Sequence, residues 1–295
     1  MTRTEEPSAA SSVSAASPER LHLQRVTENT VVAIDPRLVS NAAAVVVGDF
    51  VVVVDVGMRP YASRLFRAAL EEGVQRPVKF VCVTHYHADH TFGLQAFKDA
   101  TVFASRQIVD TLAESADWSP EARARWKQDD PEGGEWLDEV EFVQPQLLFQ
   151  QALDIVGGDD RVEFHHSGGH TSCSVYGYYP REKVLLAGDL IFAGRFPFAG
   201  DASADPEAWM STLRTWLEMD IEQVIPGHGP VSGMDEIAKQ LEFLEILKRN
   251  TLQAIKAGGD HRDIVMPTVY PPAAEDEWFA GRTLERWYEY YRSKA

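Results

Sequence analysis

The sequence predicts an α/β fold in which the strands come in two sets, each followed by helices. Three observations indicate this. Short apolar runs bounded by Gly, Pro or Asp recur along the chain. Stretches with apolar residues at helical spacing lie between and after them. Residues of the kind that bind metal ions stand where three of the apolar runs end, after Val83, Leu186 and Ile225.

The first set of strands surrounds one helix and leads into a histidine-rich segment. Strands are indicated by β-branched and aromatic residues between turn signals, and the helix by apolar residues three and four positions apart. In order, the predicted elements are strands within residues 26–36 and 41–57 with turns at Asp35-Pro36 and Gly48-Asp49, a helix at 61–73 that ends at Gly73, a buried strand from Val78 to Val83, a helix start at 91–97 and a short strand at 101–105.

Residues 107–150 differ from their surroundings. They are polar, they include the stretch DDPEGGE, and they contain Trp118, Trp126 and Trp136. We expect an inserted helical segment or lid here rather than a part of the central sheet. The three tryptophans are suited either to line a hydrophobic substrate cleft or to bury the insert against the rest of the domain.

The second set of strands follows this insert, and no short-period repeat is visible. Asp205-Pro206 forms a suitable start for the first helix of this half. The predicted elements are strands within residues 161–180 and 183–192, a helix at 205–219, a strand at 221–231 that runs into a Gly/Pro loop, a long amphipathic helix at 233–259 and a final helix at 280–294.

The length of 295 residues allows one large domain or two small ones, and the composition is that of an ordinary globular protein. The first 20 residues are rich in Ala and Ser, and we expect a disordered tail there, followed by a single domain at residues 21–295. Glu5 and Glu6 stand where a secretory signal would be basic. A Ser-rich organelle transit peptide is the alternative for this tail. No apolar run reaches the roughly 18 residues of a membrane span.

Charge and cysteine content bound the partners and the compartment. The net charge of −17 argues against nucleic acid or an anionic membrane surface as the main partner, because phosphate binding needs clustered positive charge. The two cysteines, Cys82 and Cys173, cannot form a disulfide framework. We therefore expect a cytoplasmic protein that acts on a small molecule.

The segment THYHADH carries the strongest chemical signal. His85 and His87 are two positions apart, so in an extended segment both side chains point the same way. Asp89 and His90 lie on the turn that follows and can face back. Imidazole and carboxylate groups are the usual ligands of zinc. Four such groups within six residues would strain one tetrahedral ion but can serve two neighbouring ions.

Two ions need more ligands, and three candidates lie downstream at strand ends. They are His170 in GGHTS, Asp189 in LLAGDLIF and His228 in IPGHGP. Each is flanked by glycine, which permits tight turns and close backbone approach. A single histidine in a Gly-rich turn is more often a surface or hydrogen-bonding residue. The combination with THYHADH is what favours a two-metal site.

The motifs VVDVG, THYHADH, GGHTS, AGD and PGHGP, in this order over about residues 25–250, resemble the metallo-β-lactamase-fold superfamily. Many true β-lactamases carry Cys or Ser where this chain has Asp189, so the resemblance is to the glyoxalase II-like and quinoprotein-associated metallohydrolases. It implies an αβ/βα four-layer sandwich: two mixed β-sheets packed face to face, helices on the outside and metals at one edge.

The resemblance also implies a ligand set. It assigns His85, His87 and His170 to one zinc ion and Asp89, His90 and His228 to a second, with Asp189 bridging the two. Asp55 of VVDVG would orient the ligand loop.

The implied activity is metal-dependent hydrolysis. Two divalent ions lower the pKa of a bridging water, and the resulting metal-bound hydroxide attacks the carbonyl of a thioester, a lactone or an amide of the β-lactam type. Asp89 would orient the hydroxide and shuttle a proton, and Asp189 is the other residue expected to be catalytic.

Other functions stay open at this point. A persulfide dioxygenase with a single iron ion uses similar ligands, and a non-catalytic metal-binding protein is a further alternative. The nuclease branch is disfavoured by the acidic composition. Arg195, Phe196 and Phe198 either reach the mouth of the substrate site or pack their own loop. Nothing in the sequence connects Arg282 or Arg286 with the site, and neither the substrate nor the oligomeric state is predicted.

Overall fold

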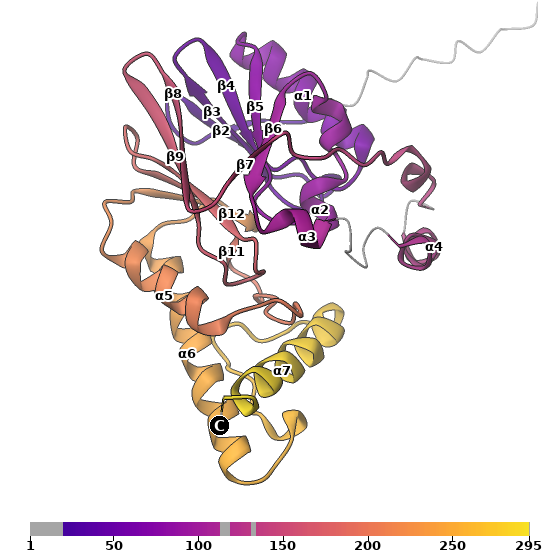
Figure 1. Cartoon of the computed structure of the whole chain (residues 1–295), viewed down its shortest axis with the longest axis vertical. Helices are drawn as coiled ribbons and strands as arrows, with labels where there is room; N and C mark the ends of the chain where they lie inside the picture. Colours follow the sequence, from indigo (N-terminus) through magenta and orange to yellow (C-terminus); the bar gives the residue numbers. More distant parts are fainter. Residues whose placement is uncertain (1–19, 113–118, 131–133, 295) are drawn as a thin grey trace, which may run out of the picture.

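The computed structural model describes residues 20–112, 119–130 and 134–294. The expected tail at residues 1–20 lies outside this range except for its last residue, and so does Trp118. Two β-sheets lie face to face with helices on their outer sides (Figure 1). Within the described residues, no helix has both the length and the apolar character needed to cross a membrane.

The first sheet is mixed and has seven strands. The first four strands pair antiparallel, and the strands from the fourth onwards pair parallel. In sheet order they are β1 (Gln24–Arg25), β2 (Thr30–Ala33), β3 (Ala42–Val47), β4 (Phe50–Val54), β5 (Val78–Cys82), β6 (Thr101–Ser105) and β7 (Leu147–Phe149). The predicted turn at Gly48-Asp49 joins β3 and β4. Gly48 adopts a φ of +60°, which an L-residue rarely tolerates.

The second sheet is also mixed. Its five strands lie in the order β12 (Gln223–His228), β11 (Val184–Phe192), β10 (Val175–Tyr179), β9 (Asp160–His166) and β8 (Ala152–Gly157). Only β11 and β12 pair parallel. All nine residues of β11 are buried, as expected for a strand that is covered on both faces.

The core between the two sheets is apolar. Side chains alternate along each strand, so Val52 and Val54 of β4 face this inner layer while Val51 and Val53 face the outer helices. Phe103 of the first sheet and Phe164 of the second meet there with ring centroids 4.8 Å apart. This inner layer holds the two sheets together.

Helices cover both outer faces and complete four layers (Figure 1). α1 (Pro60–Val74) and the short η1 (Leu94–Phe97) pack on the first sheet. α5 (Pro206–Leu217), α6 (Met234–Lys256) and α7 (Glu277–Arg292) pack on the outer side of the second sheet around three fully buried tryptophans, Trp209, Trp216 and Trp287. The remaining elements are α2 (Ala88–Thr91), α3 (Ile108–Leu112), α4 (Pro120–Asp129), η3 (Glu135–Glu139), η4 (His261–Asp263) and η5 (Ala274–Asp276). The predicted αβ/βα sandwich is therefore confirmed.

Residues 107–150 are helical over much of their described length, as predicted, but their last part is not. Leu147–Phe149 joins the first sheet as β7, parallel to β6. Trp136 is buried beside Leu137 and Val140, whereas Trp126 contacts Phe92 with ring centroids 5.5 Å apart. β7 escaped prediction because three residues are too few to display the alternation of a strand.

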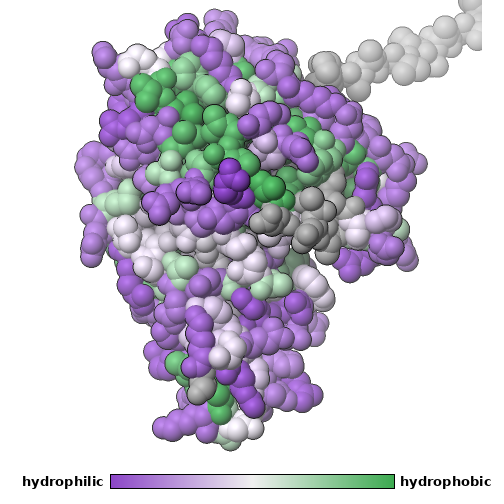
Figure 2. Space-filling model, viewed as in Figure 1, coloured by the Kyte–Doolittle hydropathy of each residue, from purple (hydrophilic) through white to green (hydrophobic). Residues whose placement is uncertain are grey.

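Most of the surface in Figure 2 is hydrophilic, in keeping with the acidic composition. Hydrophobic residues gather in the upper half of this face, where Figure 1 places the strands.

Candidate metal centre

The ligand-type residues come from separate parts of both sheets and meet at one end of the sandwich. His85, His87, Asp89 and His90 follow β5, the last two on α2. His170 lies in the loop between β9 and β10. Asp189 lies on β11, and His228 ends β12. All seven predicted residues are thus brought together, in two groups.

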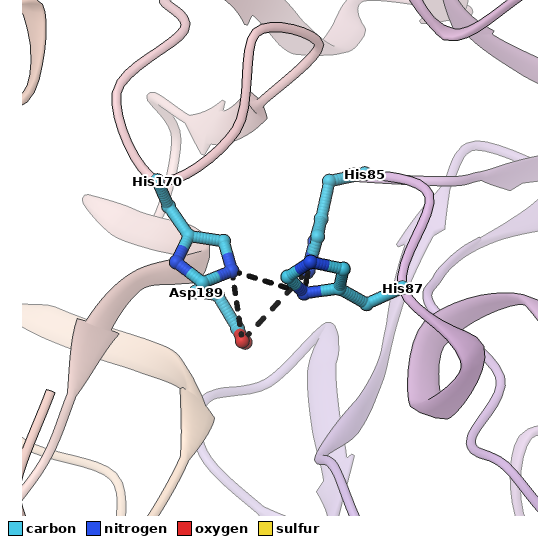
Figure 3. A group of neighbouring side chains, drawn as sticks. All are labelled: His85, His87, His170 and Asp189. Carbon is cyan, nitrogen blue, oxygen red and sulfur yellow. Dashed lines mark hydrogen bonds and ion pairs between the residues drawn. The ribbon is translucent and has the colours of Figure 1, made fainter. Parts of the chain in front are cut away.

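The first group contains three imidazoles and one carboxylate (Figure 3). His87 Nδ1 lies 2.9 Å from His85 Nε2 and 3.2 Å from His170 Nε2. Asp189 Oδ2 lies 3.8 Å from His85 Nε2 and 3.5 Å from His170 Nε2. These four atoms point toward one another from segments that are up to about a hundred residues apart in the chain.

The second group lies beside the first and shares Asp189 with it. Asp89 Oδ2 is 3.1 Å from His228 Nε2 and 3.5 Å from His90 Nε2. Asp189 approaches the same two rings, with Oδ1 3.1 Å from His90 Nε2 and Oδ2 3.4 Å from His228 Nε2. Asp189 is therefore in contact with members of both groups.

The backbone around Asp189 is shaped for this position. The pairing of β11 with β12 shifts register on both sides of Gly188, which adopts a φ of +51°. Such a bulge re-aims the side chain that follows it. A Cβ at Gly227 would lie 1.9 Å from Asp189 Oδ1, so only glycine at position 227 leaves room for the carboxylate.

The geometry fits metal ions. Donor atoms bound tetrahedrally to zinc lie roughly 3.3 Å from one another, and the observed separations of 2.9 to 3.8 Å bracket this value. His90 Nε2 and Asp189 Oδ1 are buried and lie 3.1 Å apart, but neither has a hydrogen-bond partner among the described residues. Buried polar atoms normally have a partner, and a cation would satisfy both of these.

Asp55 fixes the loop that carries the first ligands, as the sequence suggested. It follows β4 with a φ of +58°, in the left-handed region. Its carboxylate accepts hydrogen bonds from Thr84 N at 2.9 Å and Thr84 Oγ1 at 2.8 Å, and contacts His90 Nδ1 at 2.8 Å. Because Thr84 Oγ1 donates to Asp55, it is free to accept from His85 Nδ1, 3.0 Å away. Both rings then present Nε2 to the site.

Asp201 performs the same task for His87, and the sequence analysis missed it. Its carboxylate lies 3.1 Å from His87 Nε2 and accepts from the Tyr86 hydroxyl and from Ser203 N. Only 8% of Asp201 is exposed. The one available signal is that residues 199–201 repeat the tripeptide AGD of residues 187–189. On the remaining ring of the first group, His170 Nδ1 lies 3.0 Å from the carbonyl oxygen of Phe198.

Burial and charge set the protonation of the two groups. Burial lowers the pKa of His170 to about 4 and that of His85 well below its usual range, so both rings are neutral near pH 7. Burial also lowers the pKa of His228, but the carboxylates of Asp189 and Asp89 outweigh it and raise this pKa to about 9. The second group thus balances its carboxylates with protons that a metal ion would displace.

A cavity of about 1140 Å³ opens onto both groups. Its lining includes Asp89, Asp189 and His228, and also Arg195, Phe196 and Phe198. Arg195 is exposed, while Phe196 is buried against Phe243. The sequence left two alternatives for residues 195–198, reaching the substrate site or packing their loop. The structure shows that both apply.

The remaining observations concern residues outside the seven of the candidate metal centre. Nothing in the sequence connects Arg282 with the site, but in the structure it lines the cavity from α7, together with Trp278 and Phe279 of the same helix. His165 stacks on Tyr176 and His166 contacts the carbonyl of Ser172, so neither belongs to the metal groups. Cys173 is buried in the apolar layer outside the first sheet.

The sequence is similar to a superfamily profile and to several known proteins. A sequence profile of the metallo-beta-lactamase superfamily matches residues 35–228. A linear primary-alkylsulfatase of Pseudomonas sp. is 22% identical over 75% of this chain and 48% of its own length. The alpha subunit of a 2,4-dinitroanisole O-demethylase of Nocardioides sp. is 26% identical over 79% of this chain and 66% of its own length. The human acyl-coenzyme A thioesterase MBLAC2 is 27% identical over 60% of this chain and 66% of its own length. The chain thus spans about half to two thirds of these relatives.

Solved structures share the fold. A metallo-beta-lactamase from Pontibacter korlensis superposes with a TM-score of 0.61 at 18% identity, over 77% of this chain and 99% of that one. The sec-alkylsulfatase Pisa1 from Pseudomonas sp. superposes with a TM-score of 0.70 at 19% identity, over 92% of this chain and 50% of that one.

Proposed function

The chain belongs to the metallo-beta-lactamase superfamily, and we propose that it is a dinuclear metal-dependent hydrolase of a small molecule. The superfamily is the one predicted from the sequence motifs. Relatives named as an acyl-coenzyme A thioesterase and as metallo-beta-lactamases support hydrolytic chemistry.

The position of Asp189 between the two groups carries this proposal. One ion would be held by His85, His87 and His170, a second by Asp89, His90 and His228, and Asp189 would contact both. Imidazole and carboxylate ligands favour zinc over magnesium or calcium. A mononuclear iron enzyme would not need the second group, so the pair of groups favours the hydrolase over the dioxygenase.

When bound, the two ions supply Lewis acidity and a nucleophilic water near neutral pH. The protein's own part is to orient and move protons. Asp89 lines the cavity, is contacted by His228, and has its backbone carbonyl bound by the Ser40 hydroxyl. Burial raises the pKa of Asp89, but His90 and His228 outweigh this and hold it well below its usual range. Asp89 is thus an ionised carboxylate, suited to orient a water and take its proton.

The bond that is cleaved is proposed to be a carbonyl-centred one: a thioester, a lactone or an amide. Alkyl sulfates are a second candidate, because alkylsulfatases occur among both the sequence relatives and the structural neighbours, and one of these covers 92% of this chain. We also propose a cytoplasmic location and no nucleic-acid partner, on the basis of two unpaired, buried cysteines and the acidic charge.

Elemental analysis of protein purified without added metal tests the proposal. Two zinc ions per chain are expected. One iron ion and no zinc would overturn it in favour of the dioxygenase, and a metal-free chain that takes up no zinc on titration would overturn the metal centre. A panel of thioesters, lactones, β-lactams, alkyl sulfates and phosphodiesters then identifies the bond that is cleaved, and failure to turn over any ester-type substrate would contradict a hydrolase.

A further inference from the structure

Part of the cavity lining comes from residues that lie outside the region matched by the superfamily profile. The match ends at residue 228, whereas Trp278, Phe279 and Arg282 of α7 line the cavity. α7 packs against α6 and is fixed to α5 by the Tyr290 hydroxyl, which donates to Asp205 at 2.6 Å. These three lining residues therefore lie outside the part of the chain that the superfamily profile matches.

This part of the lining is aromatic and unusually exposed. Trp278 is 62% and Phe279 41% exposed, although large apolar side chains are normally buried. Both contact Phe198, with ring centroids 6.4 Å and 5.2 Å away. We call Phe198, Trp278 and Phe279 the aromatic wall.

The aromatic wall reaches the candidate metal centre. The ring centroid of Phe198 lies 6.0 Å from that of His170 and 6.3 Å from that of His87. A continuous aromatic surface therefore runs from the outside of α7 to the ligands of the first group. Aromatic side chains at the rim of a cavity bind apolar groups through large contact areas and ring stacking.

A positive charge lies in the same cavity. Arg195 is exposed and makes no hydrogen bond or ion pair with any residue in the described part of the chain. Arg282 is paired with Glu285, so its charge is partly balanced. Among the carboxylates of the lining, Asp201 is held by His87 and Asp276 accepts from Ala273 N. Arg125 of α4 also lines the cavity, is exposed and has no such partner among the described residues. Arg195 lies three positions from Phe198 of the aromatic wall, so of these two cations we take Arg195 as the one that binds an anionic group.

We propose that the aromatic wall binds the apolar chain or ring of the substrate while Arg195 binds an anionic group, so that the substrate is an amphiphilic anion. This inference rests on the proposed hydrolytic function. The same chemistry is offered by an acyl thioester with an anionic leaving part and by an alkyl sulfate. In both, α7 sets the preference for long over short apolar groups.

Binding measured without turnover tests the wall independently of catalysis. We expect calorimetric titration of the metal-loaded protein to show that octanoate and octyl sulfate bind at least about 10-fold more tightly than acetate and octanol. The Trp278→Ala and Phe279→Ala variants should each weaken octanoate binding by about 3- to 10-fold, the loss typical of an aromatic contact. Arg195→Ala should lower the affinity for octanoate until it is close to the affinity for octanol. Phe142→Ala, which has the same exposed fraction as Phe279 but lies away from the cavity, and Arg249→Ala on α6 should leave all affinities unchanged.

Turnover provides the second readout. For octanoyl and acetyl thioesters, or octyl and ethyl sulfates, Trp278→Ala should lower kcat/KM for the long substrate several-fold more than for the short one. Equal losses, or octanol binding as tightly as the two anions, would overturn the inference. If the binding pattern holds but no ester of either type is cleaved, the wall is supported and the proposed function is the part that fails.

Discussion

At the residue scale, the proposed two-ion site depends on the carboxylate of Asp189. It is 5% exposed and contacts both groups of ligand-type residues, and glycine at position 227 leaves the space that it occupies. No neighbouring side chain in the described part of the chain duplicates these contacts.

We therefore expect Asp189→Ala to bind one metal ion fewer and to lose about 1,000-fold or more in kcat. The reason is that Asp189 would hold both ions, so its loss would weaken the binding of the ions that supply the nucleophilic water and the Lewis acidity. Elemental analysis and initial rates measure the two effects, and circular dichroism verifies folding. Asp154→Ala, an exposed carboxylate on β8, is the matched control. Unchanged metal content in Asp189→Ala would contradict the bridging role.

Asp201 contacts His87, one of the candidate metal ligands. Asp201→Asn keeps the size of the side chain but weakens its hold on His87 Nε2, so the Nδ1 lone pair is presented less well. We expect zinc affinity to fall by about 10- to 100-fold, the usual effect of losing such a partner. Competition with a chromogenic chelator measures it, with Asp154→Asn as control. An affinity equal to that of the unmodified protein would show that Asp201 only packs the loop.

Sequence reasoning identified the seven ligand-type residues and Asp55, but not the other residues that position them. The ligands follow strand ends within motifs, so their order along the chain is visible. Tyr86 and Asp201 acquire their roles only when the loop after β11 folds against the loop after β5. That contact joins positions more than a hundred residues apart, and a single sequence carries no pattern for it.

At the element scale, the start of α5 connects two helices. Asp205 precedes Pro206, accepts hydrogen bonds from Glu207 N and Ala208 N at 3.0 Å, and also accepts from Tyr290 of α7. The Asp-Pro pair made this helix start predictable from the sequence. The link to α7 was not predictable, because it depends on how the C-terminal helix folds back.

Asp205→Ala should destabilise the protein by about 1–2 kcal/mol, because the first turn of α5 loses its cap and the Tyr290 hydroxyl its acceptor. Urea unfolding of the metal-free protein, followed by circular dichroism, measures the change. Glu218→Ala, at the exposed end of the same helix, serves as control and should shift the midpoint little. A midpoint for Asp205→Ala equal to that of the control would contradict the cap.

The helices and strands with a clear hydrophobic periodicity in the sequence were the ones that could be predicted. The amphipathic α1, α5 and α6 were found, whereas β7 and β8 are short or half-exposed and give weak signals. The helix start at 91–97 resolves into α2 and η1 instead. Gly93 between them packs so closely on α1 that a Cβ would lie 2.0 Å from Ser63 Oγ. This close packing, rather than helix propensity, sets the local conformation.

At the scale of the whole molecule, the two thiols lie in two separate layers of the sandwich. Cys82 lies in the apolar layer between the sheets, and Cys173 lies in the layer between the first sheet and its helices. Both are fully buried. Burial raises the pKa of Cys173 to about 11 and that of Cys82 well above its usual range. Since the thiolate is the reactive form, both thiols should be nearly inert in the folded protein.

We expect neither thiol to react with a chromogenic disulfide reagent at pH 8 in the native state. At that pH a thiol of pKa about 11 is only about one part in a thousand thiolate, and packing also denies the reagent access. In urea both should react at once, because unfolding restores ordinary pKa values and separates both layers together. Adding zinc before the urea should shift reaction of both thiols to higher urea concentration, since the ligands span both sheets and binding stabilises the folded state. Fast reaction of one thiol in the native protein would show instead that its layer opens independently of the rest.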